Sequence, residues 1–239
     1  QDDPETPYKN IVACDENAAT LHHVSYRRTA SPTRAATLSG ARSLLVDAGA
    51  TCYGYCSDIT RTYVKGHGAV ASAFAELVAA LDALQRALCG EVRLGLPYEQ
   101  LHDRAHEYIA NTLVNAGVVR CSPEEAVDSG ITRAFFPHGL GHSLGLQCHD
   151  VGCALIKPRP DNPFLRNTSR IAERQCFTIE PGVYFIDALL EPLRAETHGS
   201  DIDWPLVTEL SALGGIRVED DLIVTGGDAV TRNLTRQFL

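Results

Sequence analysis

Two aspartates in the segment 43–63 have the spacing of a paired-carboxylate site. Asp47 lies in the apolar run SLLVDAGA (43–50), and Asp58 lies in the aromatic and β-branched run YGYCSDITRTY (53–63). We predict a β-hairpin that turns near Thr51–Gly54 and places the two carboxylates directly opposite each other. Like charges at opposite positions are destabilising unless a cation lies between them. The spacing therefore indicates a divalent-cation site, and the alternative is a pair of solvated acids on an exposed face.

A second candidate segment is rich in histidine and glycine. Residues 136–152 read FPHGLGHSLGLQCHDVG and contain three histidines, His138, His142 and His149, among four glycines. Glycine permits backbone angles and close approaches that other residues do not. A single histidine is most often structural, whereas three in one glycine-rich loop indicate a functional site.

Two further segments place acids inside apolar strands. Glu180 lies in FTIEPGVYF (177–185), and Arg217 and Glu219 lie two residues apart in GGIRVED (214–220), so they share one strand face. A buried acid costs several kcal/mol unless it is paired or coordinated. Taken singly, each acid is equally consistent with an ordinary ion pair.

Together these segments supply the charge that two divalent cations require. Four carboxylates, from Asp47, Asp58, Glu180 and Glu219, balance two M²⁺ ions. Hard oxygen ligands with a single imidazole suit Mn²⁺, with Co²⁺ as the alternative, better than a structural zinc. We therefore expect a dinuclear centre.

The elements that must position these residues follow from periodicity. Apolar residues at spacings of three and four predict helices over 70–88 and 98–116, and a capping box predicts a short helix from Ser122. Strands are expected over 175–186 and 216–225. A hairpin, then helices, then strands, without regular βαβ alternation, predicts an α+β fold in one domain.

Composition excludes some classes of protein. The formal net charge of −9 disfavours binding of nucleic acid or anionic lipid, and no apolar run has the length of a membrane helix. The first residues do not resemble a signal peptide, and Gln1 is interpreted as a point within a longer chain. We expect a cytoplasmic protein whose eight cysteines are reduced thiols packed as small apolar residues.

By several long motifs in one order, the chain resembles the pita-bread metallopeptidases. Within that family it is most similar to the bacterial Xaa-Pro dipeptidases (prolidases) and organophosphorus acid anhydrolases. The motifs are PYKNIVACDENAATLHH, LLVDAGATCYGYCSDITRT, FFPHGLGHSLGLQCHDVG, FTIEPGVYF, GGIRVED and NLTRQFL. The resemblance implies a curved antiparallel sheet with helices on its outer face. It also implies that residues 1–239 are a catalytic domain, with the N-terminal domain of a homodimeric full-length enzyme apparently absent.

The resemblance also implies roles for individual residues. The metal ligands would be five residues, with Asp58 and Glu219 each bridging both ions: Asp47, Asp58, His142, Glu180 and Glu219. Residues implied to act in catalysis or to contact substrate are Glu180, His138, His149, Arg217, Arg166, His22, Tyr8 and Tyr98.

The expected activity is hydrolysis of Xaa-Pro dipeptides by a hydroxide that bridges the two ions. Glu180 would transfer the proton, His149 or His138 would stabilise the oxyanion, and Arg217 or Arg166 would pair with the proline carboxylate. The alternatives are an aminopeptidase P-like activity, organophosphate hydrolysis in the same site, and a binding module that has lost catalysis.

Three features depart from this pattern or compete with it. About seven extra residues lie around Arg34–Arg42 compared with the family, and Ala172–Gln175 replaces the usual Gln-Pro-Gly-Met turn. His102 and His106 have the i, i+4 spacing of helical zinc proteases, but Asp103 replaces the required Glu. We expect these two histidines to lie on a solvated helix face.

Overall fold

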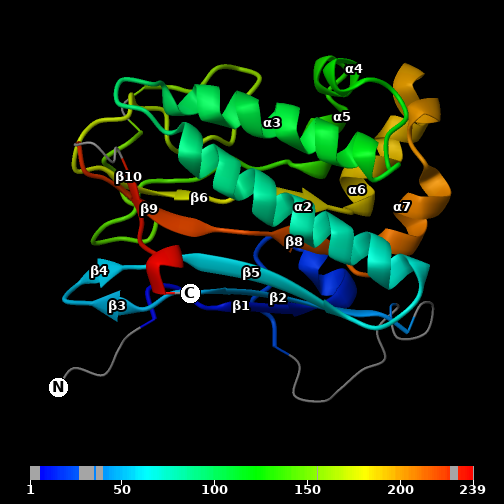
Figure 1. The fold of residues 1–239 in the computed structure, drawn as a ribbon, viewed down its shortest axis with the longest axis horizontal. Coiled ribbons are helices and arrows are strands. Elements are labelled where there is room, and N and C mark those ends of the chain that lie inside the picture. The colour runs from blue at the N-terminus through cyan, green and yellow to red at the C-terminus, as the bar shows by residue number, and fades with distance from the viewer. Residues whose placement is uncertain (1–5, 27–34, 36–39, 155, 227–230, 239) are drawn as a thin grey trace.

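A computed structural model describes residues 6–26, 35, 40–154, 156–226 and 231–238 (Figure 1). The insertion predicted around Arg34–Arg42 lies largely outside these residues. The strands are β1 (Ile11–Cys14), β2 (Arg42–Ala48), β3 (Thr51–Cys52), β4 (Tyr55–Cys56), β5 (Ile59–Lys65), β6 (Cys176–Ile179), β7 (Gly182–Tyr184), β8 (Gly215–Arg217), β9 (Asp220–Val224) and β10 (Thr231–Asn233).

The helices fall in the middle of the chain and between the later strands. The α-helices are α2 (Ala69–Glu91), α3 (Tyr98–Asn115), α4 (Pro123–Asp128), α5 (Ile131–Phe135), α6 (Asp187–Leu190) and α7 (Trp204–Ser211). Short 3₁₀ turns are η1 (Asp15–Ala19), η2 (Glu191–Ala195), η3 (Thr197–Asp201) and η4 (Arg236–Phe238). No helix in the described ranges combines the length and apolarity needed to span a membrane.

The predicted hairpin forms, but its register differs from the prediction. Strand β2 pairs antiparallel with β5, and Asp47 lies opposite Thr60 rather than opposite Asp58. The turn falls at Tyr53 and Gly54, whose φ angles of 50° and 81° are the positive values that a two-residue hairpin turn requires. Because Asp58 and Thr60 are two residues apart, Asp58 still shares the face of Asp47, as a diagonal neighbour.

The later strands extend this antiparallel surface. Strands β10, β9 and β6 form one sheet, β7 pairs with β8, and β1, β2 and β5 form another. An isolated bridge between Thr60 and Glu219 links β5 to the β8–β9 segment. The two halves of the sequence thus meet along β5.

Helices α2 and α3 lie side by side over one face of these strands (Figure 1). The buried residues of α2 are those at the predicted spacing, including Phe74, Leu77, Leu81 and Leu88. Helix α4 begins with the predicted capping box between Ser122 and Glu125. The chain therefore combines helices with antiparallel sheets, which confirms the α+β prediction.

The solvated helix face predicted for His102 and His106 is wrong. Both side chains point into the protein, with residue exposures of 3% and 2%. Their rings contact each other and the ring of Phe136, with centroids 4.8 to 5.6 Å apart. This face of α3 packs on α5. One contact there is between His106 Nδ1 and Thr132 Oγ1, which are 3.1 Å apart.

The turn at 172–175 forms without the expected glycine. Gln175 closes it by donating its backbone N–H to Ala172 and accepting the Ala172 N–H on its side chain. Arg174 adopts a φ of 67°, in the left-handed region that favours glycine. The turn that leads into β6 is therefore retained.

Candidate metal centre and cavity

Four strand segments and one loop bring the five predicted metal ligands together. Asp47 comes from β2, Asp58 from the residue before β5, Glu180 from the end of β6 and Glu219 from the β8–β9 segment. The Nε2 atom of His142 lies 3.4 Å from Asp58 Oδ2, 3.6 Å from Glu180 Oε1 and 3.9 Å from Glu219 Oε1. Three carboxylates thus surround one imidazole nitrogen.

Strand β6 fixes the position of His142. Backbone N–H groups of Thr178 and Glu180 donate to the carbonyls of His142 and Leu140, so the histidine loop runs along the strand. A Cβ atom on Gly141 would lie 2.2 Å from the Thr178 carbonyl oxygen. Glycine is required at this position because the two backbones approach so closely.

Tyr8 joins the two hairpin aspartates. Its hydroxyl oxygen lies 2.6 Å from Asp47 Oδ1 and 2.5 Å from Asp58 Oδ1. Burial and both carboxylates raise the pKa of the Tyr8 phenol, so the hydroxyl stays protonated as a donor. The predicted convergence of Asp47 and Asp58 is therefore present despite the shifted register.

Thr60 and Arg217 hold the remaining oxygens of the cluster. Thr60 donates from Oγ1 to Glu219 Oε2 at 2.6 Å and accepts from Arg217 Nε at 3.2 Å. Arg217 also donates to Asp47 Oδ2 at 2.5 Å. Sequence analysis missed Thr60, although it lies in the quoted motif two residues after Asp58.

The acids repel one another in a buried setting. Burial raises the pKa of Glu180 to about 7, although the nearby His142 and Arg217 act to lower it. Burial, together with Asp58 and Glu180, raises the pKa of Glu219 well above its usual value, and burial likewise raises that of Asp47. Such shifts mark a cluster whose negative charge exceeds the positive charge that Arg217 supplies.

Asp58 and His142 behave differently because they are hydrogen-bonded to each other. Burial acts to raise the pKa of Asp58, but bonds from His142, Cys148 and Tyr8 outweigh it and the pKa is lowered. Burial acts to lower the pKa of His142, but the Asp58 bond and Glu180 raise it above its ordinary value. A proton on His142 therefore supplies positive charge to the cluster.

The donor set fits divalent metal ions. Single ligand atoms of Asp58, His142 and Glu219 all lie within 4.8 Å of one another. Carboxylate oxygens with one imidazole suit hard or borderline divalent ions. Asp47 and Glu180 line the same cavity as these three residues.

A hydrogen-bonded chain runs from Arg217 to His138. Arg217 donates to the Tyr184 hydroxyl at 2.9 Å, and that oxygen lies 2.8 Å from His138 Nε2. His138 Nδ1 lies 2.8 Å from the Gly139 carbonyl, which can only accept. Burial and Arg217 lower the pKa of His138 to about 3, so the ring is neutral and both of its nitrogens are engaged. Tyr184, which sequence analysis also missed, fixes its orientation.

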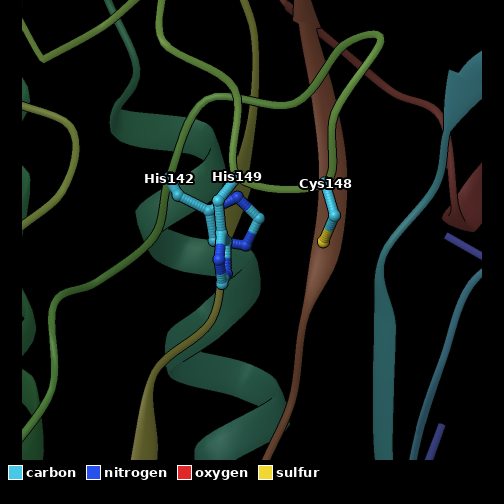
Figure 2. A group of neighbouring side chains, drawn as sticks. All are labelled: His142, Cys148 and His149. Atoms are coloured by element: carbon cyan, nitrogen blue, oxygen red, sulfur yellow. The ribbon is translucent and has the colours of Figure 1, made fainter. Parts of the chain in front are cut away.

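His149 and Cys148 lie beside the cluster on the same loop as His142. The rings of His142 and His149 are 4.3 Å apart, centroid to centroid (Figure 2). Arg166 NH1 lies 3.1 Å from His149 Nδ1, and burial lowers the pKa of His149 to about 4. Cys148 Sγ lies 2.9 Å from Asp58 Oδ2, and burial and Asp58 raise its pKa, so it is a thiol donor.

A cavity of about 380 Å³ opens over the cluster. Asp47, Asp58, His142, Glu180 and Glu219 line its floor, and His22, His138, His149, Arg166 and Arg217 line its walls. Leu21, Phe164 and Leu189 add an apolar side. A pocket of this size with a few convergent polar groups is typical of a small-molecule site.

Two predicted substrate residues, Tyr98 and Tyr8, do not line this cavity. Tyr98 is fully buried and donates to the Thr178 carbonyl at 2.6 Å. It therefore supports the strand that carries Glu180. Tyr8 contacts Asp47 and Asp58, and the other predicted residues line the cavity.

Comparison with known proteins identifies the family. Residues 2–226 match the Metallopeptidase family M24. The chain belongs to metallopeptidase family M24. It is 44% identical over 245 residues to the Xaa-Pro dipeptidase of Stenotrophomonas maltophilia strain R551-3, covering 99% of this chain and 52% of that protein. Xaa-Pro dipeptidase 1 of Idiomarina loihiensis is 42% identical over 240 residues, with 98% and 50% covered. This M24 chain thus spans about half the length of the curated relatives that it matches.

Solved structures agree on the fold of this M24 chain. A histidine-to-alanine variant of Escherichia coli aminopeptidase P superposes with a TM-score of 0.73 at 26% identity, covering 98% of this chain and 45% of that one. The same enzyme with the inhibitor Pro-Leu gives a TM-score of 0.72 at 26% identity, over the same shares of the two chains. The predicted pita-bread fold is confirmed, and membership of the family implies that the protein uses divalent metal ions.

Proposed function

We propose that this chain hydrolyses dipeptides of the form Xaa-Pro with two divalent ions, and that these ions are Mn²⁺. The observation that carries the proposal is the convergence of four carboxylates and the His142 imidazole at the floor of one cavity. Four carboxylates and two dications balance in charge. The similarity to Xaa-Pro dipeptidases over nearly the whole chain supports the substrate class.

We assign the metal ligands as Asp47, Asp58, His142, Glu180 and Glu219. When bound, two such ions supply a Lewis acid for the scissile carbonyl and lower the pKa of the attacking water. Thr60, Tyr8 and Arg217 would orient the ligand oxygens, since each is hydrogen-bonded to one or two of the carboxylates.

Glu180 is the group that we propose accepts the proton of the attacking water and returns it to the leaving proline nitrogen. The value of about 7 that burial gives its pKa applies to the metal-free chain, and a bound dication would lower it, so the proposal rests on the position of the carboxylate. It also lines the cavity, so a substrate can reach it.

The geometry favours His149 over His138 as the donor to the developing oxyanion. Both nitrogens of His138 are engaged, by Tyr184 and by the Gly139 carbonyl. His149 accepts from Arg166 at Nδ1, so its proton lies on Nε2, which is left to donate. We propose that His138 orients the cavity wall and that His149 contacts the substrate.

A similar argument separates the two arginines. Arg217 is buried, and its donors already bind Asp47, Thr60 and Tyr184. Arg166 is exposed and lines the cavity. We propose that Arg166 binds the proline carboxylate, with the proline ring against the apolar side formed by Phe164 and Leu189.

The test is hydrolysis of Gly-Pro, Ala-Pro and Leu-Pro by the metal-loaded chain, with Ala-Leu as the matched dipeptide without proline. We expect Mn²⁺-dependent cleavage of the proline dipeptides, abolished by a chelator and restored by Mn²⁺. Cleavage of Ala-Leu as fast as Ala-Pro, or no cleavage of any of the four, would refute the proposal.

The second candidate is aminopeptidase P-like cleavage of longer Xaa-Pro peptides, which the structural similarity to aminopeptidase P favours. Comparing Ala-Pro with Ala-Pro-Ala separates the two. Because relatives are about twice as long, we propose that residues 1–239 form a catalytic domain whose dipeptide selectivity requires an N-terminal domain and a homodimer. A cytoplasmic location remains a prediction.

A further inference from the structure

Cys148 is a soft ligand placed beside a cluster of hard ones. Its sulfur lies 2.9 Å from Asp58 Oδ2, yet it is not among the five ligands assigned above. The neighbouring residue His149 is exposed, so its ring can rotate away from Arg166. His142 directs its Nδ1 to the Ser143 carbonyl at 3.0 Å, which leaves Nε2 facing the cluster.

These three side chains form a group of their own (Figure 2). Single ligand atoms of His142, Cys148 and His149 all lie within 4.8 Å of one another. The group has a nitrogen–nitrogen–sulfur donor set, whereas the hydrolytic cluster is mainly oxygen. Thiolate and imidazole favour Zn²⁺, and carboxylate favours Mn²⁺.

We propose that His142, Cys148 and His149 form a second metal position that binds Zn²⁺. Zinc in proteins is bound by four ligands, or by three with the fourth position left to water or another group. Asp58, which lies within reach of both Cys148 and His142, can supply the fourth ligand. On binding, the Cys148 S–H bond breaks, its proton leaves to solvent, and a zinc–thiolate bond forms.

The position shares His142 and Asp58 with the proposed hydrolytic centre. Neither side chain can serve both geometries at once, so Zn²⁺ at the thiol position displaces the arrangement that Mn²⁺ uses. Zinc therefore inhibits Mn²⁺-supported hydrolysis, and the inhibition depends on Cys148. This consequence rests on the proposed function, whereas the binding of a thiophilic metal does not.

Cadmium tests the binding directly, because it is a thiophilic stand-in for zinc whose thiolate complexes absorb in the ultraviolet. The metal-free chain is titrated with Cd²⁺ in wild type, Cys148→Val and Cys56→Val, the last being a matched half-buried cysteine nearby. We expect a charge-transfer band that saturates at one Cd²⁺ per chain in wild type and Cys56→Val and is lost in Cys148→Val. Cys148→Ser, which keeps the size without the soft donor, replaces the valine variant if that variant does not fold. A band that persists without Cys148, or is absent from wild type, overturns the proposal.

Zinc inhibition tests the consequence. Each variant is assayed for Ala-Pro hydrolysis with Mn²⁺, and the half-inhibiting Zn²⁺ concentration is measured relative to its own uninhibited rate. Removing Cys148 should raise that concentration at least about tenfold, the lower end of the effect of losing even an outer-shell partner. Cys56→Val should leave it unchanged. Equal inhibition by Zn²⁺ in all three chains overturns the proposed competition between Zn²⁺ and Mn²⁺. Failure of Mn²⁺ to support any hydrolysis counts against the proposed function. In that case the cadmium titration alone decides whether the binding site exists.

Discussion

His142 and the pair His102 and His106 are buried to the same extent but differ in protonation. Their residue exposures are 3%, 3% and 2%. The pKa of His142 is raised, because Asp58 and Glu180 outweigh burial. Burial lowers the pKa of His102 to about 4, and burial together with His102 lowers that of His106 to about 2. Burial acts to lower all three pKa values, and only at His142 does neighbouring negative charge outweigh it.

His102 and His106 also differ from His142 in their hydrogen bonds and packing. Among the described residues, His102 Nδ1 and His106 Nε2 have no hydrogen-bond partner. Both rings pack against the Phe136 ring and against each other, and His106 Nδ1 also contacts Thr132 Oγ1. We infer that the pair contributes packing, whereas His142 contributes chemistry.

The largest expected effect is a loss of activity. It is tested by changing a histidine to glutamine at His142 and, separately, at His106. His142→Gln should lower kcat/KM for Ala-Pro by roughly 10³-fold or more, a loss of ~4 kcal/mol in transition-state stabilisation. His106→Gln keeps the same size and polarity at a site that we place outside the chemistry, so it should retain most of the activity. Similar losses of activity in both variants, with both shown to be folded by circular dichroism, would contradict the inference that His142 acts in the chemistry and His106 only in packing.

Metal removal should affect stability because the cluster repels itself. A ligand at a hundredfold excess over Kd stabilises the folded state by ~2.7 kcal/mol. For a domain of this size that corresponds to about 5 to 10 °C in Tm. Scanning calorimetry before and after chelation measures it, and an unchanged Tm would mean that the acids do not hold metal in the folded chain.

The histidine pair predicts a pH dependence of stability. Its folded pKa values of about 4 and about 2 lie below the unfolded value, so the unfolded chain binds more protons below pH 6.5. Stability is therefore present above that pH and is lost as the pH falls, at ~1.4 kcal/mol per pH unit for each histidine. Urea unfolding of the metal-free chain between pH 6.5 and pH 5 measures this contribution as the difference between wild type and a His102→Asn, His106→Asn variant, because the raised pKa of Glu180 acts in the opposite direction in both chains. The variant should lose less stability than wild type as the pH falls, and an identical slope would argue against neutral buried rings.

The smallest expected effect on stability comes from a histidine whose side chain is partly exposed, in contrast to the three buried ones. His198 pairs with Asp201 at 2.9 Å, with side-chain exposures of 43% and 32%. Exposed pairs contribute about 0 to 1 kcal/mol. His198→Ala should therefore change the free energy of unfolding by less than about 1 kcal/mol. A larger change in urea unfolding would mean that this pair has a structural role that its exposure conceals.

Sequence patterns predicted the parts of the fold and site that depend on local chemistry. The spacing of Phe74, Leu77 and Leu81 gave α2, and the Ser122–Glu125 box gave the start of α4. The four acids and one histidine at the cavity floor were all predicted to converge. The acids lie in motifs where a charged residue interrupts apolar or aromatic residues, and His142 lies in the histidine- and glycine-rich loop.

What could not be predicted depends on contacts between distant segments. The hairpin register followed from the positive φ angles of Tyr53 and Gly54, which moved the turn and set Asp47 opposite Thr60. Helices α6 and α7 were missed because they are short and held by tertiary packing. All eight cysteines are free, and Cys153, Cys89 and Cys121 pack against apolar surroundings or are buried as expected, whereas Cys14 and Cys52 are exposed, so the prediction was wrong for those two.

The most direct test of the metal centre is the metal content and activity of Asp58→Asn. The substitution keeps the side-chain shape but leaves three carboxylates for two dications. After loading with Mn²⁺ and gel filtration, wild type and the exposed control Asp128→Asn should retain two ions per chain and hydrolyse Ala-Pro. Asp58→Asn should retain fewer than two and lose the activity. Two ions per chain with near wild-type turnover in Asp58→Asn would contradict the five-ligand centre.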